Sequence, residues 1–235
     1  MYYLRRLAVI TARGGSKRIP RKNIKEFCGK PILAYSIEAA IKSEMFDTVM
    51  VSTDDKEIAE IAIQYGAEVP FFRSERTSDD FATTNDVLLE VIDEYEKRGQ
   101  SFDVVCCIYP TAPFITASKL KDGMERLQNS DADTLIPVVD FSYPPQRAMH
   151  EIDGYIAPIY PENLDARSQD LKKQYHDIGQ FYIAKVEKYK ENKKLMVGKI
   201  LPMFVSELEV QDIDNQIDWE LAELKYQLLV SKGVI

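Results

Sequence analysis

The chain has 235 residues, of which 45% are hydrophobic, which is enough for one large α/β domain with a substantial core, or for one domain with a small appended lobe. Its formal net charge of -8 argues against nucleic acid or an anionic membrane as the main partner, because both require an extended basic surface. No segment has the length of a membrane span, and the apolar run after Arg6 is too short for a signal peptide. We therefore expect a cytoplasmic protein.

The predicted elements alternate between strands and helices along the chain. Short apolar runs predict strands or extended segments at residues 7–11, 48–52, 68–72, 103–109, 134–141, 179–184 and 199–210. Helical periodicity and capping residues predict helices at residues 31–41, 54–64, 86–98, 118–127, 185–192 and 217–230. Such alternation favours βαβ units and a mostly parallel sheet between two helical layers, with the ligand site at the carboxyl ends of the strands.

Two regions depart from this alternation. Residues 142–174 carry several prolines and scattered aromatic residues without periodicity, which predicts an inserted lobe with a hairpin through Gly154. The three cysteines, Cys28, Cys106 and Cys107, form no CxxC pair, and adjacent cysteines on a strand face opposite ways. Buried free thiols in a reducing compartment are the expected outcome.

The first strand ends in a cationic, glycine-rich loop. Gly14 and Gly15 have no Cβ, so the backbone can turn sharply and present N–H groups to an anion. The surrounding charges come from Arg13, Lys17, Arg18, Arg21 and Lys22. In an acidic chain, this cluster predicts a polyphosphate site in preference to a solvated basic turn, although it matches neither the Walker A loop nor the GxGxxG fingerprint.

A pair of carboxylates follows the last extended segment. Asp212 and Asp214 are separated by one residue, so on an extended chain both point to the same side and can share a hard cation. Capping of the final helix by Asp214 or Asn215 is the plainer reading, and it accounts for one residue but not for both.

From Ala12 to Ile24 the chain reads ARGGSKRIPRKNI, which resembles the signature ARGGSKxIPxKNI of the CMP-sialic acid synthetase family, the cytidylyltransferases that activate nine-carbon sugar acids. The resemblance implies a three-layer Rossmann-like nucleotidyltransferase fold, with CTP and a nine-carbon sugar acid as substrates. It also implies Mg²⁺ on Asp212 and Asp214, which would orient the phosphates, and a homodimer in which the lobe at 142–174 reaches across to its partner.

The same resemblance implies roles for residues around the nucleotide. Charge shifting onto the leaving pyrophosphate would be neutralised by Arg13, Lys17 and Lys22, with Asp212 as the fourth catalytic residue. The segment from Arg73 is similar to the family's RPxxLAxDTA pattern, with Asp80 and Ala82 in corresponding places and Ser74 in place of the proline. The implied nucleotide-binding residues are Ala12, Gly14, Gly15, Ser16, Asn23, Arg73, Ala82 and Thr84.

Further motifs bear on the sugar. Tyr109 opens YPTAPF, which is similar to the family's LQPTSPLR turn, and it stands where sialic acid synthetases have a glutamine. The patterns FSYPPQRA, RSQDL and YHDIGQFYI resemble the pseudaminic acid cytidylyltransferase branch, in which a tryptophan stands at the position of Ile183. A guanidinium pairs bidentately with a carboxylate, so Arg147 and Arg167 are candidates to bind the carboxylate of the sugar acid. The implied sugar-binding residues are Tyr109, Arg147, Arg167, Gln169, Tyr175, His176, Asp177 and Gln180.

Together these patterns predict a transferase that joins CMP from CTP to the anomeric hydroxyl of a nonulosonic acid. Among these acids, the patterns favour pseudaminic acid as the substrate. A sibling enzyme for N-acetylneuraminate or legionaminate is the nearest alternative, and a 3-deoxy-manno-octulosonate cytidylyltransferase is more distant. A nucleotide-sugar glycosyltransferase would also use a sheet and a DxD pair, but it would not activate free CTP. A non-catalytic nucleotide-binding module is expected to lack Lys22 or one of the two aspartates, and this chain has all three.

Overall fold

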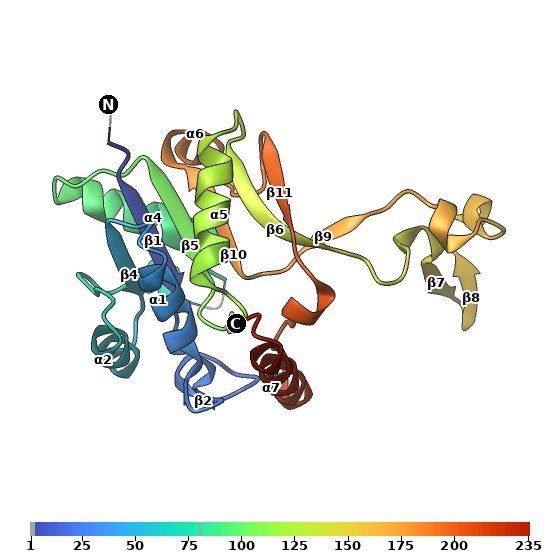
Figure 1. Ribbon diagram of the computed structural model, residues 1–235, viewed down its shortest axis with the longest axis horizontal. Helices are drawn as coiled ribbons and strands as arrows, with labels where there is room; N and C mark the ends of the chain where they lie inside the picture. Colours follow the sequence, from blue (N-terminus) through green and yellow to red (C-terminus); the bar gives the residue numbers. More distant parts are fainter. Residues whose placement is uncertain (1–2, 80) are drawn as a thin grey trace.

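One mixed sheet organises the described chain, residues 3–79 and 81–235 of this computed structural model. Its seven strands lie in the order β11-β6-β10-β5-β1-β4, with β9 paired to β6 (Figure 1). Five strands run in one direction, and β9 and β10 run against them. The strands are β1 (Arg6–Thr11), β4 (Thr48–Ser52), β5 (Val104–Ile108), β6 (Thr134–Asp140), β9 (Tyr175–Asp177), β10 (Phe181–Lys185) and β11 (Ile200–Phe204).

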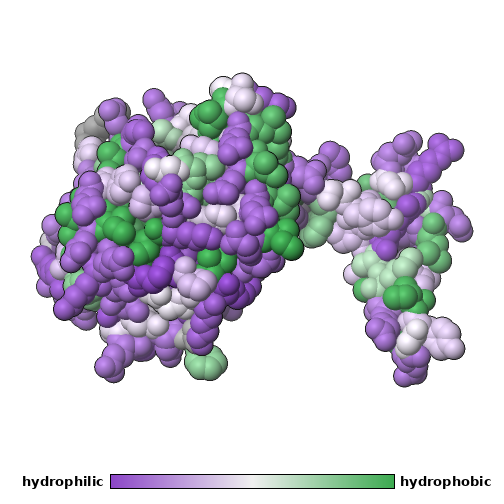
Figure 2. Space-filling model, turned by 90° about the horizontal axis from the view of Figure 1, so that it is seen from below, coloured by the Kyte–Doolittle hydropathy of each residue, from purple (hydrophilic) through white to green (hydrophobic). Residues whose placement is uncertain are grey.

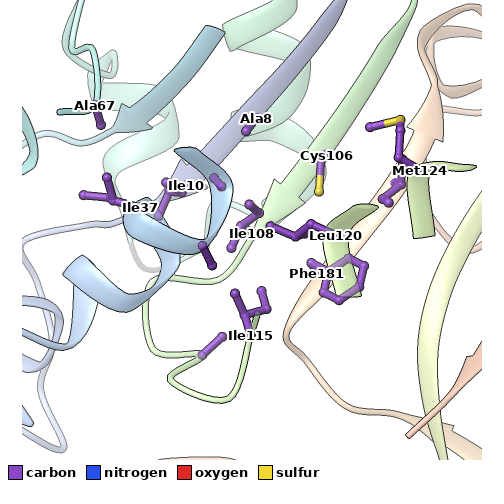
Figure 3. Packing of buried hydrophobic residues seen from close by; sticks show 14 of the residues in the cluster. Ala8, Ile10, Ile37, Ala67, Cys106, Ile108, Ile115, Leu120, Met124 and Phe181 are labelled. Atoms are coloured by element: carbon purple, nitrogen blue, oxygen red, sulfur yellow. The ribbon is translucent and has the colours of Figure 1, made fainter. Parts of the chain in front are cut away.

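Side chains along the central strands point alternately to the two faces of the sheet, so the core has one layer on each face. In β1, Ala8 and Ile10 pack on one face of the sheet, while Leu7 and Val9 pack on the other. The neighbouring strand β5 separates Cys106 and Cys107 in the same way, and Figure 3 shows Cys106 among the residues of the first layer. Both thiols are free and buried, as predicted, whereas Cys28 is free but only partly buried.

Helices cover both faces of the sheet. The first layer contains residues of α1 (Ile32–Lys42), α2 (Lys56–Gln64) and α5 (Ala117–Gln128). The second contains residues of α4 (Thr84–Lys97) and α6 (Val186–Asn192). Shorter helical turns are α3 (Glu75–Ser78), η1 (Lys22–Ile24), η2 (Pro145–Arg147), η3 (Pro161–Asn163), η4 (Ser168–Asp170) and η5 (Glu207–Glu209). The predicted three-layer α/β fold is therefore confirmed.

The last helix, α7 (Gln216–Ser231), packs outside these layers through an aromatic cluster. The Trp219 ring lies edge-on to Phe27, with ring centroids 5.5 Å apart, and the Lys25 ammonium sits 4.4 Å from the Trp219 ring centroid. Phe27 belongs to a small hairpin of β2 (Glu26–Phe27) and β3 (Lys30–Pro31) that leads into α1. The β2–β3 hairpin near the start of the chain and the last helix thus pack against each other in this cluster.

The segment between β6 and β9 forms a separate lobe that projects away from the sheet (Figure 1). It contains the predicted hairpin, made of β7 (Met149–Ile152) and β8 (Tyr155–Pro158). Asp153 and Gly154 form its turn with φ of 51° and 81°, a left-handed conformation that favours glycine. A narrow neck joins this lobe to the main body (Figure 2).

Several boundaries differ from the sequence prediction. The strand predicted at 68–72 is wrong: only Glu68 bridges to Met50, and Pro70 has no N–H with which to continue a ladder. The extended run at 199–210 is a strand only over β11 and then turns into η5. The short strands β2, β3 and β9 were not predicted. Among the described residues, no helix is long and apolar enough to span a membrane.

Gly123 provides a test of how closely α5 packs on the sheet. A Cβ at this position would lie 3.0 Å from Ile183 Cδ1 and 3.3 Å from Leu135 Cδ2. We expect Gly123→Leu to lower the free energy of unfolding by about 1–3 kcal/mol through overpacking. The matched control is Glu125→Leu, which adds the same side chain at an exposed position of α5 and should change stability by less than about 0.5 kcal/mol. Equal effects in urea denaturation would contradict this packing.

Candidate functional site

The glycine-rich loop lies across the carboxyl ends of the central strands. Ala12 is buried and donates its N–H to Ser52 O at 2.9 Å, which continues β1 alongside the end of β4. Beyond it, a cavity of about 190 Å³ opens between the loop and the turn after β5. We call this the cationic cavity; its lining includes Thr11, Arg13, Ser16, Lys17, Arg18, Lys22, Asn23, Pro110 and Thr111.

The loop is fixed from behind by the start of α2. The Gly14 N–H donates to Asp54 Oδ1 at 2.9 Å, and Asn23 Nδ2 donates to Arg13 O at 2.8 Å. A Cβ on Gly14 would lie 2.8 Å from Asp55 Oδ2, whereas a Cβ on Gly15 would have nothing within 4 Å. Neither glycine has a φ in the left-handed region. Gly14 is therefore required for close approach and not for an unusual backbone turn.

Arg21 does not join the cationic cluster, contrary to the sequence prediction. Its guanidinium donates to both carboxylate oxygens of Asp55, at 2.5 and 3.1 Å, and also pairs with Glu57. Asp55 in turn caps α2 by accepting from Ile58 N at 3.0 Å. The bond from Arg21 holds the pKa of the Asp55 carboxyl below its usual value. Arg21 thus joins the loop to α2 instead of facing a ligand.

A second cavity, of about 440 Å³, adjoins the cationic cavity and is called here the Arg73 cavity. Arg73 Nε and Nη2 donate to Ser52 O at 3.2 and 2.8 Å, and Nε also donates to Ser52 Oγ at 2.9 Å. Burial lowers the pKa of Arg73 to about 10. The Ala82 N–H donates to Asp79 Oδ1 at 2.7 Å, and Asp80 lies outside the described residues. The lining also includes Thr84 and Tyr109.

A third cavity, of about 410 Å³, is called the Asp212 cavity. It brings together the turn after β5, residues 176–182 from the end of β9 to the start of β10, and the segment before α7. Four predicted sugar-binding residues line it with the predicted catalytic carboxylate; they are Tyr109, His176, Asp177, Gln180 and Asp212. Thr111 lines all three cavities, and Tyr109 lines the second and third. The three cavities therefore adjoin one another at the end of β5.

Hydrogen bonds run along the wall between the second and third cavities. Tyr109 OH lies 3.3 Å from Thr84 Oγ1, and Tyr182 OH donates to Asp177 Oδ2 at 2.6 Å. Burial raises the pKa of both tyrosines, so both hydroxyls keep their protons. His176 Nδ1 lies 2.8 Å from Asp177 O, and because a carbonyl only accepts, Nδ1 carries the proton. Sequence reasoning missed Tyr182, although it stands two residues after Gln180, a spacing that puts side chains on the same side of an extended chain.

A fourth cavity, of about 410 Å³, lies behind Tyr109 and Tyr182. It is called the Leu195 cavity, and Leu195 and Met196 supply apolar surface to it. Asn85 fixes its wall, because Asn85 Oδ1 accepts from Leu195 N at 3.2 Å. Sequence reasoning missed this cavity, since residues 194–196 belong to no motif and reach it only through the fold.

The acidic segment 209–214 pairs with no strand of the described chain. Side chains from three other parts of the chain donate hydrogen bonds to its carbonyl groups instead. Gln180 Nε2 donates to Glu209 O at 2.6 Å, Lys225 Nζ to Val210 O at 2.6 Å, and Lys22 Nζ to Ile213 O at 2.7 Å. The Glu209 side chain also pairs with Lys119, and both side chains are only 13% exposed. These contacts set where Asp212 and Asp214 lie.

The two aspartates suit a magnesium ion that also binds phosphate oxygens. Ile213 between them is buried, and Asp214 pairs with Arg18 at 2.6 Å. Burial lowers the pKa of Lys22, and Asp214 and Asp212 both act against that shift, so both carboxylates lie near this ammonium. Within residues 3–79 and 81–235, no group of three or more His, Cys, Asp or Glu forms a metal cage. Magnesium commonly binds through one or two carboxylates with substrate phosphates, which matches this pair.

Four predicted sugar-binding residues lie apart from these cavities. Arg147, Arg167 and Gln169 are on the projecting lobe, and Tyr175 is on β9, where its ring packs against Phe204 with centroids 4.9 Å apart (Figure 1). Arg147 donates to Ala166 O, and its Nε is buried without a partner. Within one chain, the lobe residues therefore do not join the Asp212 cavity.

Comparisons with known proteins agree with this arrangement. The sequence model of a family described as "Cytidylyltransferase" matches residues 7–198. The chain is 38% identical to pseudaminic acid cytidylyltransferase of Campylobacter jejuni subsp. jejuni serotype O:23/36 (strain 81-176) over 226 residues, which cover 96% of this chain and 97% of that protein. It is 34% identical to CMP-N,N'-diacetyllegionaminic acid synthase of Legionella pneumophila over 231 residues, with coverages of 96% and 97%.

A solved structure shows the same fold. CMP:2-keto-3-deoxy-manno-octonic acid synthetase, complexed with CTP, superimposes with a TM-score of 0.71 and covers 97% of this chain and 99% of its own. At 16% sequence identity, this likeness concerns the fold.

The contrast between the two loop glycines can be tested by substitution. We expect Gly14→Ala to lower the free energy of unfolding by about 1–3 kcal/mol, because the new methyl group would push the loop off Asp55. Gly15→Ala is the matched control and should change it by less than about 0.5 kcal/mol, since its Cβ enters open space. Chemical denaturation measures both variants, and equal losses would refute a steric role for Gly14.

Proposed function

This chain belongs to the cytidylyltransferase family, and on that premise we propose that it transfers CMP from CTP to the anomeric hydroxyl of a nonulosonic acid, with release of pyrophosphate. Pseudaminic acid is the substrate we propose first, because two relatives that carry its name match the chain over nearly its whole length. The structural observation that carries the proposal is the meeting of three cavities at Thr111.

The three cavities differ in chemistry in the way this reaction requires. Basic side chains make the cationic cavity suited to a triphosphate. The Arg73 cavity adjoins it and has room for a base and ribose, with Thr84 on its wall. The Asp212 cavity offers hydroxyl, amide and carboxylate groups that match the hydroxyl and acylamino groups of a sugar. In the Leu195 cavity behind Tyr109, the apolar surface of Leu195 and Met196 suits a methyl or acyl substituent.

The reaction needs positioning and charge more than covalent help from the protein. The anomeric oxygen of the sugar forms a bond to the α-phosphorus, the bond to the pyrophosphate oxygen breaks, and the hydroxyl proton is released. Arg13, Lys17 and Lys22 are proposed to stabilise the negative charge that develops on the departing pyrophosphate. Lys22 also contacts Ile213 O, so the same side chain joins the phosphate loop to the acidic segment.

Asp212 and Asp214 are proposed to hold Mg²⁺. When bound there, the ion would supply positive charge for the phosphate oxygens and lower the pKa of an oxygen that it coordinates. The pairing of Asp214 with Arg18 and the contact of Lys22 with Ile213 keep this acidic pair next to the cationic cavity.

The sugar acid also needs groups that recognise its carboxylate. We propose a homodimer in which Arg147, Arg167 and Gln169 reach the Asp212 cavity of the partner chain. Exposed apolar side chains on the lobe support this assignment, because such surface is usually covered by protein; Tyr143, Met149 and Tyr155 are between 60% and 78% exposed.

The substrate assignment is tested by pyrophosphate release from CTP in the presence of magnesium. With pseudaminic, N,N'-diacetyllegionaminic and N-acetylneuraminic acids offered separately at equal concentration, we expect kcat/KM to be highest for pseudaminic acid by at least tenfold, because Tyr109 replaces the glutamine found in sialic acid synthetases. Preference for either other acid would keep the proposed reaction but make that acid the substrate. No release with any of the three would reject the proposed reaction.

The role of Asp212 is tested by Asp212→Ala. We expect kcat to fall about 10²–10³-fold, because a carboxylate near the phosphates is lost, while the melting temperature changes little for this exposed side chain. Glu207→Ala, which removes an exposed carboxylate from the neighbouring turn η5, is the matched control and should retain wild-type kcat. Magnesium binding, followed by calorimetry without turnover, should weaken in Asp212→Ala only. Unchanged binding and rate would remove Asp212 from the proposed site.

A further inference from the structure

One arginine of the loop after β1 contacts the proposed metal pair directly. Arg18 Nη1 lies 2.6 Å from Asp214 Oδ2, and the Arg18 side chain is 70% exposed, compared with 39% for that of Asp214. Asp212, the other member of the pair, is exposed to solvent. The two carboxylates are therefore not equivalent, because a cation of the chain itself already binds one oxygen of Asp214.

The ion pair with Arg18 is not what holds Asp214 in place. The Asp214 N–H donates to Asp218 Oδ2 at 2.9 Å. The neighbouring Ile213 is buried, and its carbonyl accepts from Lys22 Nζ at 2.7 Å. An exposed ion pair contributes little to folding stability, because water screens the charges and a long side chain loses conformational freedom. The contact between Arg18 and Asp214 therefore has little to add to the position of the acidic segment.

The same arginine borders both cavities on the nucleotide side. Arg18 lines the cationic cavity, and it lines the Arg73 cavity as well. Burial lowers the pKa of Lys22, and the nearby Arg18 and Arg13 add to that shift, so these three cations lie close together. Arg18 thus lies between the acidic pair and the volume proposed for the triphosphate.

We propose that Arg18 exchanges partners during the reaction cycle: it competes with Mg²⁺ for Asp214, and it binds the outer phosphates of CTP once the metal has taken that carboxylate. A guanidinium and a magnesium ion repel each other, so they do not share one carboxylate oxygen. A guanidinium also pairs bidentately with phosphate oxygens, which CTP brings into the adjoining cavity. This inference rests on the proposed function and assigns a role to a residue outside the proposed catalytic set.

Such an exchange couples the affinity for the metal to the affinity for the nucleotide. Without nucleotide, Arg18 competes for Asp214 and lowers the metal affinity of the pair. The triphosphate draws Arg18 away, so CTP raises the metal affinity, and by linkage the metal raises the CTP affinity by the same factor. The acidic pair therefore holds its ion tightly only when the substrate whose charge the ion neutralises is present.

Metal binding without nucleotide tests the exchange by its sign. We expect Arg18→Gln to bind Mn²⁺, a paramagnetic substitute for Mg²⁺, about two- to fivefold more tightly than wild type, because the competing cation is gone. Electron paramagnetic resonance measures the free ion. Lys56→Gln removes an exposed positive charge at the start of α2 and is the control, with a change of less than about 1.5-fold. If Arg18 only held Asp214 in position, Arg18→Gln would bind Mn²⁺ more weakly; weaker or unchanged binding would overturn the proposal.

A double variant shows whether the effect passes through Asp214. In an Asp214→Asn background, Arg18→Gln should no longer tighten Mn²⁺ binding, because the carboxylate for which the two cations compete is gone. An equal gain in both backgrounds would show a general effect of net charge and would contradict the exchange. Absence of Mn²⁺ binding in wild type and in Arg18→Gln alike would contradict it too.

The nucleotide half of the exchange predicts the opposite sign. CTP binding, measured by calorimetry with Mg²⁺ and without sugar acid, should weaken about tenfold in Arg18→Gln, because a charge-assisted contact with phosphate is lost. Arg18→Lys keeps the positive charge and should recover part of the loss. Circular dichroism checks that each variant stays folded. Unchanged CTP affinity in Arg18→Gln would reject the transfer of Arg18 to the phosphates.

The exchange and the proposed reaction can fail separately. If Arg18→Gln binds Mn²⁺ more tightly and CTP more weakly, but wild type releases no pyrophosphate with any of the three acids, the exchange stands and the proposed reaction falls. If release is normal and Arg18→Gln alters neither metal nor CTP binding, the proposed reaction stands and the exchange falls.

Discussion

The contact between Lys22 Nζ and Ile213 O, 2.7 Å long, joins two segments that are 191 residues apart in the chain. The acidic segment at 209–214 belongs to no sheet, so its position depends on this contact and on those from Gln180 and Lys225. Because Lys22 belongs to the loop after β1, the acidic pair and the cationic cavity keep a fixed relation to each other. The other residues of the site lie around these two segments.

The electrostatics of the site reinforce the same coupling. Burial alone would favour a neutral Lys22, and the nearby Asp214 and Asp212 raise its pKa again. Arg18 pairs with Asp214, while Arg21 pairs with Asp55 at the start of α2. Basic residues of this segment therefore contact two carboxylates, one at the site and one at the start of α2. An acidic chain can in this way keep a concentrated positive charge at one edge of its sheet.

Residues with local signals were predictable, and residues brought in by the fold were not. The apolar run of β1, the Gly14 loop and the spacing of Asp212 and Asp214 all depend on near neighbours in the sequence. The antiparallel direction of β10 and the approach of Leu195 to Tyr109 depend on tertiary packing. Such packing produces no periodic pattern of apolar residues in the sequence. Arg21 shows a further limit, because composition groups it with the other basic residues and only the neighbouring Asp55 and Glu57 turn it away.

The antiparallel direction of β10 has a consequence for communication within the molecule. Because β10 begins where β5 ends, residues 178–180 of the Asp212 cavity come before their strand, whereas Tyr109 and Thr111 come after theirs. The chain leaves the lobe directly into β9, whose residues His176 and Asp177 already line the cavity. Lobe and cavity wall are thus one continuous length of backbone, so a displacement of the lobe acts first on the Asp212 cavity. It reaches the cationic cavity through segment 209–214, which Gln180 and Lys22 both contact.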